Sequence, residues 1–284
     1  MRVVQIAFAT SRTHQAVDTE IPLLVTAAAA RGHRADSAVW DDPGVEWSSF
    51  DAVVVRSCWD YTERRKHFVA WAHSIPAVQN PARVIEWNTD KVYLREFAAG
   101  GTPVIDTYWN VRAGDDIGDH AEWVCKPSVS AGSRDTARWT TREEVYAHSA
   151  QLVSDGRTSM VQPYIQSVDS DGETAMIFLG GEFSHAIRKG QLLHKGEGVR
   201  QDRDNRESIT PRAPTAAQHE IAAESLASVA RLLALGDPLV YARVDLVTAL
   251  DGSPLVIELE LTEPSLFIAH GRDSADRLIR ALER

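Results

Sequence analysis

The sequence predicts an α/β protein that starts with a parallel βαβ lobe and continues with helices mixed with antiparallel strands. Its 284 residues are more than one ordinary domain needs, and they suit two or three compact lobes with a ligand cleft between them. Residues 51–56 read as a strand whose middle is continuously apolar, which is typical of parallel strands buried on both faces. Between Trp123 and Ile187, by contrast, short strands alternate with turns, which indicates antiparallel pairing.

The first 85 or so residues alternate short apolar runs with helical patterns, as a βαβ lobe does. The expected strands cover residues 3–9, 37–40 and 51–56, and the expected helices cover about 21–31, ended by Gly32, and 62–74. In such sheets ligands collect beyond the carboxyl ends of the strands. We therefore expect a ligand near residues 10–13 and 57–61.

The elements of the remaining chain follow from turn and cap signals. Residues 88–90 are typical of the cap of a short helix over residues 91–99, which a pair of glycines ends. Further strands are expected at 123–127, 160–163, 173–179, 182–187, 240–247 and 255–261, with a long amphipathic helix at 216–235. The stretch from Lys189 to Arg212 is charged and lacks periodicity, so we expect a mobile loop that acts as a lid.

The composition excludes several classes of function. A formal charge of -10 argues against a nucleic-acid surface, and no run approaches the ~18 apolar residues of a membrane span. The apolar run at the N-terminus is too short for a signal peptide, so we expect a cytoplasmic protein. The histidines and the two cysteines, Cys58 and Cys125, lack metal-ligand spacing, so zinc is not expected. The sequence shows no heptad repeat or broad apolar surface, so it does not decide whether the protein forms a homo-oligomer.

Four charged residues near the C-terminus form the sharpest local pattern. Arg243 and Asp245 lie two apart on one expected strand, and Glu258 and Glu260 lie two apart on the next. Because side chains alternate along a strand, each pair shares a face, and a hairpin turning at residues 251–252 would gather all four. Buried carboxylates need cations, and hard oxygen ligands suit Mg²⁺ bound with phosphates. The alternative is an ordinary solvated face of an antiparallel sheet.

A second pattern suits polyphosphate. Lys126 ends an expected strand and precedes a small-residue loop, Ser128 to Ser133, whose backbone N–H groups and neighbouring ammonium could hold phosphate oxygens. Lys91, Arg188 and Lys189 are further cations. Each of them taken singly is as readily explained as an exposed, solvated side chain.

The order of these patterns resembles the ATP-grasp superfamily over essentially the whole chain. The matching segments are Lys91, V-C-K-P with Lys126, the loop S-A-G-S, V-Q-P-Y-I at residues 161–165, R-V-D at 243–245 and I-E-L-E at 257–260. The resemblance implies three lobes: a parallel βαβ lobe over residues 1–85, a central ATP-binding lobe over 86–165, and a C-terminal antiparallel lobe with a metal site over 166–284.

The same resemblance implies roles for individual residues. ATP phosphates would contact Lys91, Lys126 and the loop at Ser130 and Gly132. The adenine would lie against a hinge made of Gln162, Pro163, Tyr164 and Ile165. Mg²⁺ would be bound by Asp245, Glu258 and Glu260, although many members have Asn at the last position, which leaves the number of metal ions open. Arg188 and Arg243 would stabilise the transferring phosphoryl group.

A narrower resemblance connects R-S-C-W-D-Y at residues 56–61, W-D-D-P at 40–43, N-P at 80–81 and E-L-E-L-T-E-P-S at 258–265 with a small bacterial branch of antibiotic biosynthesis. That branch includes cycloserine synthetase, an O-ureidoserine cyclo-ligase. It implies a substrate pocket formed by Arg56, Ser57, Trp59, Asp60 and Ser265. The alternatives are that Asp60 caps a helix while Trp59 packs in an interface, and that Arg56 pairs with one of the protein's own acids.

The expected reaction is activation of a small amino-acid-like carboxylate by Mg-ATP, followed by attack of an amine nitrogen on the acyl phosphate. Cyclisation of O-ureidoserine to cycloserine is the preferred form. An intermolecular ligase, of the dipeptide or glutathione type, and a nucleotide-binding regulatory protein without turnover are the alternatives.

Overall fold

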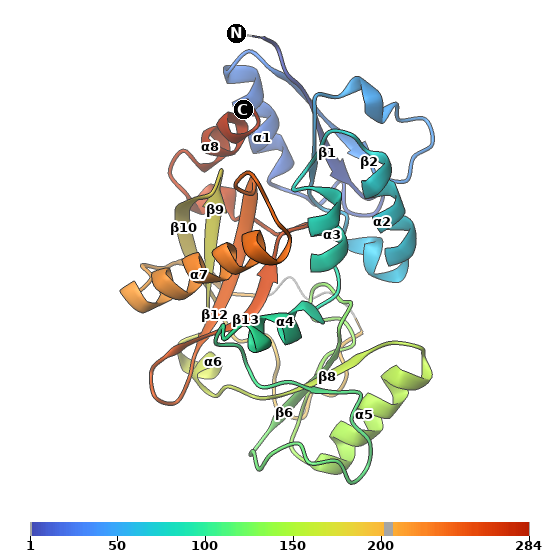
Figure 1. Ribbon diagram of the computed structural model, residues 1–284, viewed down its shortest axis with the longest axis vertical. Helices are drawn as coiled ribbons and strands as arrows, with labels where there is room; N and C mark the ends of the chain where they lie inside the picture. The colour runs from blue at the N-terminus through green and yellow to red at the C-terminus, as the bar shows by residue number, and fades with distance from the viewer. Residues whose placement is uncertain (1, 202–206, 284) are drawn as a thin grey trace.

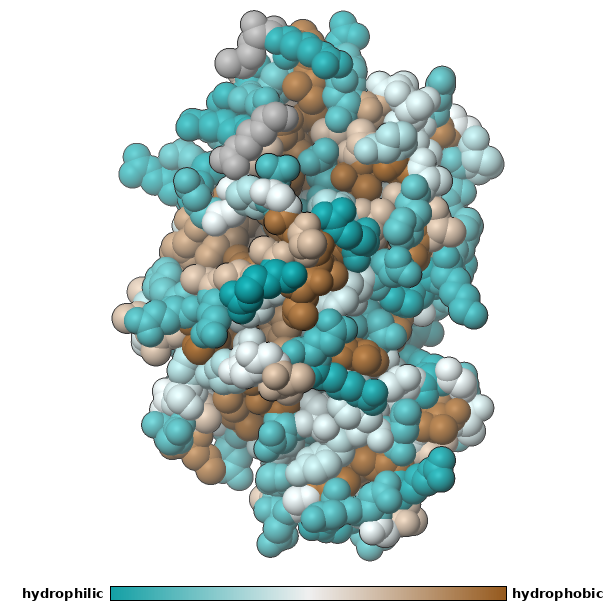
Figure 2. All heavy atoms as spheres, viewed as in Figure 1, coloured by the Kyte–Doolittle hydropathy of each residue, from teal (hydrophilic) through white to brown (hydrophobic). Residues whose placement is uncertain are grey.

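The computed structural model describes residues 2–201 and 207–283 and contains three sheets that succeed one another along the chain (Figure 1). The first sheet is parallel, and the second and third are antiparallel, as the sequence predicts. On the face shown in Figure 2, apolar residues lie in several patches separated by polar side chains. No helix among the described residues is long and apolar enough to cross a membrane.

The N-terminal sheet has the order β2-β1-β3-β4. Its strands are β1 (Gln5–Thr10), β2 (Arg34–Val39), β3 (Ala52–Val55) and β4 (Val78–Gln79), and its main helices are α1 (Ile21–Ala30) and α2 (Arg65–Ser74). Alternate residues of β1 face opposite sides: Ile6 and Phe8 pack with α1, whereas Ala7 and Ala9 share a core with Phe68 of α2. Burial on both faces explains the uninterrupted apolar strands.

The middle sheet has the order β5-β8-β6-β7. It consists of β5 (Tyr108–Trp109), β6 (Trp123–Pro127), β7 (Ala137–Trp139) and β8 (Ser159–Pro163). Helix α5 (Arg142–Ser154) covers one face, with Val145 and Leu152 in a core with Cys125 and Val161. A capping box between Thr141 and Glu144 fixes where α5 begins.

The C-terminal sheet has the order β11-β10-β9-β12-β13. Its strands are β9 (Glu173–Leu179), β10 (Glu182–Lys189), β11 (Ile209–Pro211), β12 (Tyr241–Thr248) and β13 (Pro254–Glu260). The short α6 (Ser167–Ser170) precedes it, and α7 (Ala216–Leu232) packs across one face through Ala222 and Val229. The hairpin between β12 and β13 turns at Gly252, whose φ of 85° favours glycine.

Two helical segments join the sheets into one body. Helices α3 (Ala82–Asn88) and α4 (Tyr93–Ala99) pack against β12 and β13 of the C-terminal sheet. The last helix, α8 (Ser274–Ala281), packs on α1 of the N-terminal lobe, beside it in Figure 1. Segment 86–99, expected in the central lobe, and the C-terminal segment therefore each contact a sheet that belongs to another part of the chain.

The sequence-based elements are confirmed with a few corrections. Several elements were not predicted: helices α3, α5, α6 and α8, the short strands β4, β5, β7 and β11, and the 3₁₀ turns η1 (Trp47–Ser49), η2 (Trp59–Glu63) and η3 (Ile268–His270). The expected loop from Lys189 to Arg212 is shorter, because β10 extends to Lys189 and β11 pairs with it. Part of that loop, residues 202–206, lies outside the described residues.

Candidate active site

A cavity of about 500 Å³ lies where the three sheets meet. It is lined by Trp59 from the N-terminal lobe, Lys126 from β6, Gln162 from β8, and side chains of β10, β12 and β13. One part of its wall is apolar and the other is densely charged. Such a combination can hold a planar apolar group at one end and an anionic chain at the other.

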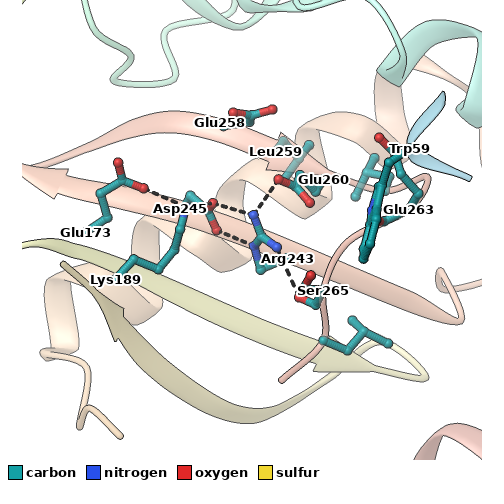
Figure 3. Close-up of polar contacts among 12 residues, drawn as sticks. Trp59, Glu173, Lys189, Arg243, Asp245, Glu258, Leu259, Glu260, Glu263 and Ser265 are labelled. Carbon is teal, nitrogen blue, oxygen red and sulfur yellow. Dashed lines mark hydrogen bonds and ion pairs between the residues drawn. The ribbon is translucent and has the colours of Figure 1, made fainter. Parts of the chain in front are cut away.

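The charged wall is built by the hairpin β12–β13. Its register places Arg243 opposite Glu260 and Asp245 opposite Glu258, with an irregularity after Asp245. Arg243 donates from Nε and Nη2 to the two oxygens of Asp245, both at 2.8 Å, and also pairs with Glu260 (Figure 3). Because Arg243 is only 4% exposed and Asp245 only 1%, the alternative of a solvated face is wrong.

Lys189 completes this network from β10. Its Nζ atom lies 3.0 Å from Asp245 and 2.8 Å from Glu173. Burial disfavours the charge of Asp245, but Arg243 and Lys189 outweigh it and lower the pKa of that carboxyl to about 2. The carboxylate therefore stays ionised and ready to bind a cation.

The three glutamates of β13 and the following loop differ in their surroundings. Burial opposes ionisation of Glu258, yet Lys91, whose Nζ lies 3.1 Å away, and Lys126 lower its pKa. Burial raises the pKa of Glu260 despite its pairing with Arg243. Burial and the neighbouring charge of Glu260 raise the pKa of Glu263 to about 8.

Lys126 faces the cavity as a cation without a protein partner. It is 8% exposed, and burial lowers its pKa. Among the described residues it forms no ion pair or hydrogen bond, whereas Lys91 donates to the backbone oxygen of Ser130 at 2.9 Å. The loop after β6 runs beside both lysines and includes Gly132 with a φ of 62°. Two ammonium groups and a small-residue loop fit a polyphosphate.

The apolar wall lies along the segment after β8. Pro163, Tyr164 and Ile165 line the cavity there, and the remaining apolar wall consists of Ile105, Val124, Val168, Leu192, Leu193 and Ile257. The Tyr164 ring is fixed by the Arg138 guanidinium, 3.5 Å from its centroid, and by the bond from its hydroxyl to Asp169. A rigid apolar slot of this kind fits a planar base.

The acids of the charged wall do not form a metal site by themselves. Among the described residues no group of three or more His, Cys, Asp or Glu is arranged to hold a metal ion. Asp245 and Glu258 are already paired with Arg243, Lys189 and Lys91. Their hard oxygens nevertheless fit Mg²⁺ if a polyphosphate binds beside them. The polyphosphate would carry the ion into the cavity and supply the remaining oxygen ligands.

Several predicted site residues do not line the cavity. Arg188 donates to the backbone oxygens of residues 170 and 171, because alternation along β10 points Lys189, not Arg188, inward. Arg56, Ser57 and Asp60, which the sequence analysis predicted to bind substrate, also lie outside the cavity lining. Each has a protein partner instead: Arg56 pairs with Glu20, Ser57 bonds to Thr10, and Asp60 accepts from Trp40 and Arg64.

The other predicted residues are brought together at the cavity. Trp59 and Ser265 line it, as do the two lysines, the loop, the hinge and most of the acid face: Lys91, Lys126, Ser130, Gly132, Gln162, Pro163, Tyr164, Ile165, Arg243, Glu258 and Glu260. Asp245 lies beneath this surface in contact with Arg243. Sequence reasoning missed the roles of Lys189, Glu173 and Glu263. Glu263 falls within E-L-T-E-P-S, but it breaks the two-residue period that singled out its neighbours.

Comparison with known proteins identifies the family of this chain. The family model described as the N-terminal domain of D-cycloserine synthetase DcsG matches residues 6–82. The cycloserine biosynthesis protein DcsG of Streptomyces lavendulae is 36% identical over 299 residues, which cover 98% of this chain and 97% of the relative. The chain belongs to the D-cycloserine synthetase family.

Solved structures agree with this membership. The crystal structure of D-cycloserine synthetase DcsG has a TM-score of 0.89 and 35% identity, covering 98% of each chain. The ATP-grasp ligase PsnB with its minimal precursor, 17% identical, shares the fold with a TM-score of 0.63, covering 99% of this chain and 100% of PsnB. This D-cycloserine synthetase homologue is therefore an ATP-dependent ligase with the ATP-grasp fold, and a regulatory protein without turnover is set aside.

Proposed function

We propose that the protein closes the ring of O-ureidoserine to form cycloserine, using Mg-ATP and an acyl-phosphate intermediate. Lys126 carries the proposal, because this buried ammonium, which has no ion pair or hydrogen bond to any described residue, faces a cavity that also holds paired acids and an apolar slot. Such an ammonium is costly unless an anion binds beside it. The name of the relative in Streptomyces lavendulae, a cycloserine biosynthesis protein, supports cycloserine as the product, and O-ureidoserine follows from the resemblance to the cyclo-ligase branch.

The cavity residues suggest how ATP would lie. Residues 162–165 would contact the adenine, and Lys91, Lys126 and the loop around Gly132 would hold the phosphates. Asp245, Glu258 and Glu260 would hold Mg²⁺, which supplies neutralisation of the charge on the phosphate oxygens. Arg243 pairs with Glu260, the carboxylate in place of the usual Asn, and opposes the rise that burial and the other acids cause in its pKa.

Arg243 is the group best placed to act on the reacting atoms. Asp245 and Glu260 fix its guanidinium on two sides, and its Nη1 donates to the backbone oxygen of Ser265 at 3.0 Å. A preorganised cation stabilises charge that develops during transfer. The substrate carboxylate would attack the γ-phosphorus with loss of ADP. The ureido nitrogen bonded to oxygen would then attack the acyl carbon, losing its proton while phosphate leaves. Water would hydrolyse the carbamoyl group that remains on this nitrogen, releasing ammonia and carbon dioxide and leaving the N–H of cycloserine.

The test measures release of ADP and phosphate from Mg-ATP with O-ureidoserine alone, and with a panel of amino acids with and without amine acceptors. Lys126→Met should lower turnover at least ~100-fold, because removing a charge that contacts transferring phosphate typically costs a few kcal/mol. Lys66→Met, an exposed lysine of α2, is the matched control. Mass spectrometry identifies the product.

Turnover with O-ureidoserine alone and a cycloserine product would support the proposal. Turnover that requires a second amine substrate would contradict ring closure and favour an intermolecular ligase.

A further inference from the structure

Glu263 is a buried cavity acid whose ionisation is favoured only by the charge of Lys91 and a hydrogen bond from Tyr61, without an ion pair to any described residue. Four other glutamates line the cavity. Glu173, Glu258 and Glu260 each form an ion pair with a lysine or arginine, and the charge of Lys189 opposes the rise that burial causes in the pKa of Glu207. Glu263 forms no such pair with any residue that the structure describes. Tyr61 lies beside the Glu263 carboxyl. A hydrogen bond from the Tyr61 hydroxyl opposes the rise in the pKa of Glu263 only in part.

The loop that carries Glu263 is fixed from two sides. Trp59 donates from its indole nitrogen to the backbone oxygen of Glu263 at 3.1 Å, and the two residues lie together at one end of the charged wall (Figure 3). On the other side, Arg243 donates to the backbone oxygen of Ser265. A carboxyl on a loop held at both ends is preorganised, so it can select a ligand group by position.

Glu20 provides a further anchor and gives Arg56 a role. The two carboxylate oxygens of Glu20 accept from the backbone nitrogens of Leu266 and Ile268 at 3.0 and 2.9 Å. Arg56, itself 2% exposed, neutralises Glu20. Arg56 therefore acts on the cavity indirectly, by fixing the backbone just after Glu263.

The chemistry of the missing partner follows from these contacts. A buried carboxylate is unfavourable without a cation, and burial accordingly raises the pKa of Glu263 to about 8. Lys91, whose charge opposes this rise, is already paired with Glu258, and Arg243 is engaged by Asp245 and Glu260. A small ligand that brings both a carboxylate for activation and a positive charge close to it would satisfy the cavity. An α-amino acid has both groups on adjacent atoms.

We propose that Glu263 binds the α-ammonium group of the amino-acid substrate, with Trp59 beside it closing that end of the cavity. This inference rests on the proposed ligase reaction and adds to it the group that separates amino acids from other carboxylic acids. Glu263 is thus a specificity-determining residue. It accepts hydrogen bonds from the substrate and takes no part in phosphoryl transfer.

The test removes the α-amine of the substrate and the carboxylate of Glu263 separately and together, as in a double-mutant cycle. O-Ureidoserine is compared with its analogue in which hydrogen replaces the α-amine, on the wild-type enzyme and on Glu263→Gln, by kcat/KM for ADP release. The kcat/KM of the wild type should be at least ~30-fold higher for the amine-bearing substrate, because removing one partner of a buried charge pair typically costs this much or more. In Glu263→Gln the preference should fall to about 3-fold or less, while the Kd of ATP stays unchanged.

Controls separate binding from structure. Glu224→Gln, an exposed acid of α7, should keep the wild-type preference. Glu263→Asp keeps the charge, so it should retain a measurable preference and serves as the second variant if the glutamine form does not fold. A purely structural role for Glu263 would lower the rates of both substrates equally and leave their ratio unchanged, which would overturn the inference.

The two proposals fail in different ways. If the wild-type enzyme turns over no amino acid, the proposed function falls and this inference falls with it. If the wild type turns over O-ureidoserine and its preference for the amine survives in Glu263→Gln, only the inference is wrong.

Discussion

Glu263 and Lys126 show how single residues at the cavity retain charges that their surroundings do not favour. Burial raises the pKa of the acid to about 8 and lowers the pKa of the lysine. Burial disfavours the charged form of each, and the proposed ligands would supply each with a partner of opposite charge. Strongly shifted pKa values of this kind gather at functional sites because binding and catalysis need groups that the fold leaves unsatisfied.

The Glu263→Gln variant should be more stable than the wild type at alkaline pH. The pKa of Glu263 is about 8 in the folded protein, against an ordinary value of 4.5, so between these values the folded state binds more protons than the unfolded state. The free energy of unfolding of the wild type therefore falls as pH rises from about 4.5 to about 8, whereas the glutamine does not titrate.

Thermal unfolding without ligand, measured between pH 4 and pH 9, checks this prediction. The Tm of Glu263→Gln should exceed that of the wild type by roughly 4 °C or more at pH 9, given about 2–4 °C per kcal/mol for a chain of this size. The gain should vanish at pH 4. A Tm difference that is the same at both ends of the range would show that Glu263 ionises normally.

Individual site residues could be predicted where strand alternation decides the face. Arg243 with Asp245 and Glu258 with Glu260 are two apart, so either all of them face the ligand or none does. Alternation alone could not choose between Arg188 and Lys189, because the inward face of β10 is set by packing. Arg56 and Asp60 lie outside the cavity lining for another reason: polar residues at a strand end suit a ligand, but here they pair with Glu20 and Arg64.

At the scale of elements, the edge strand β13 is covered by polar side chains instead of by another strand. The Tyr93 hydroxyl donates to the Leu259 carbonyl at 3.0 Å and accepts from the Leu259 amide at 2.8 Å. Asn88 makes equivalent bonds to the Leu259 carbonyl and the Leu261 amide, both at 2.7 Å. These contacts protect an edge that could otherwise pair with another chain. They also fix the strand that presents Glu258 and Glu260.

Replacing Tyr93 with Phe should destabilise the protein by about 1–3 kcal/mol, because the buried amide of Leu259 would lose its acceptor. It should also lower kcat/KM, since the register of β13 places the acids. Urea unfolding and ADP release measure the two effects. Tyr146→Phe removes an exposed hydroxyl that bonds to the Asp115 carbonyl, and it should cost no more than about 0.5 kcal/mol. Equal costs in both variants would refute the covering role.

The predictability of elements followed the strength of their periodicity. Strands β9, β12 and β13 and helix α7 were predicted within a few residues, because turns and alternating apolar positions define them. Helix α5 was missed although Thr141 and Glu144 form a capping box. Its buried apolar residues, Val145 and Leu152, are too sparse to show a helical period. Helix α3 has only seven residues, and packing on the C-terminal sheet stabilises it more than its own sequence does.

At the scale of the whole molecule, one core connects the first and last helices with the C-terminal sheet. Leu24 of α1, Leu278 and Ile279 of α8 and Tyr241 of β12 belong to the same buried cluster. The N-terminal lobe is therefore not an independent unit. This connection could not be predicted. The local sequence gives only a weak signal for a helix at α8, and it contains no information on where that helix packs.

Leu278→Ala should lower the free energy of unfolding by about 2–5 kcal/mol, the usual cost of a cavity in a well-packed core. Because the core is shared, the N-terminal lobe and the C-terminal sheet should become less stable together. Hydrogen exchange read by mass spectrometry should show faster exchange in both β1 and β9. Leu232→Ala, whose side chain is 46% exposed, is the control. Faster exchange confined to α8 would contradict a shared core.

The pairing of α1 with α8 also determines when the protein can mature in the cell. The apolar side of α1 leaves the ribosome early, but the helix that covers it is complete only after residue 281 has been translated. Until then Leu24 and its neighbours lack their final partners, and the N-terminal lobe stays open to chaperones. Helix α1 is thus translated early but completes its packing late.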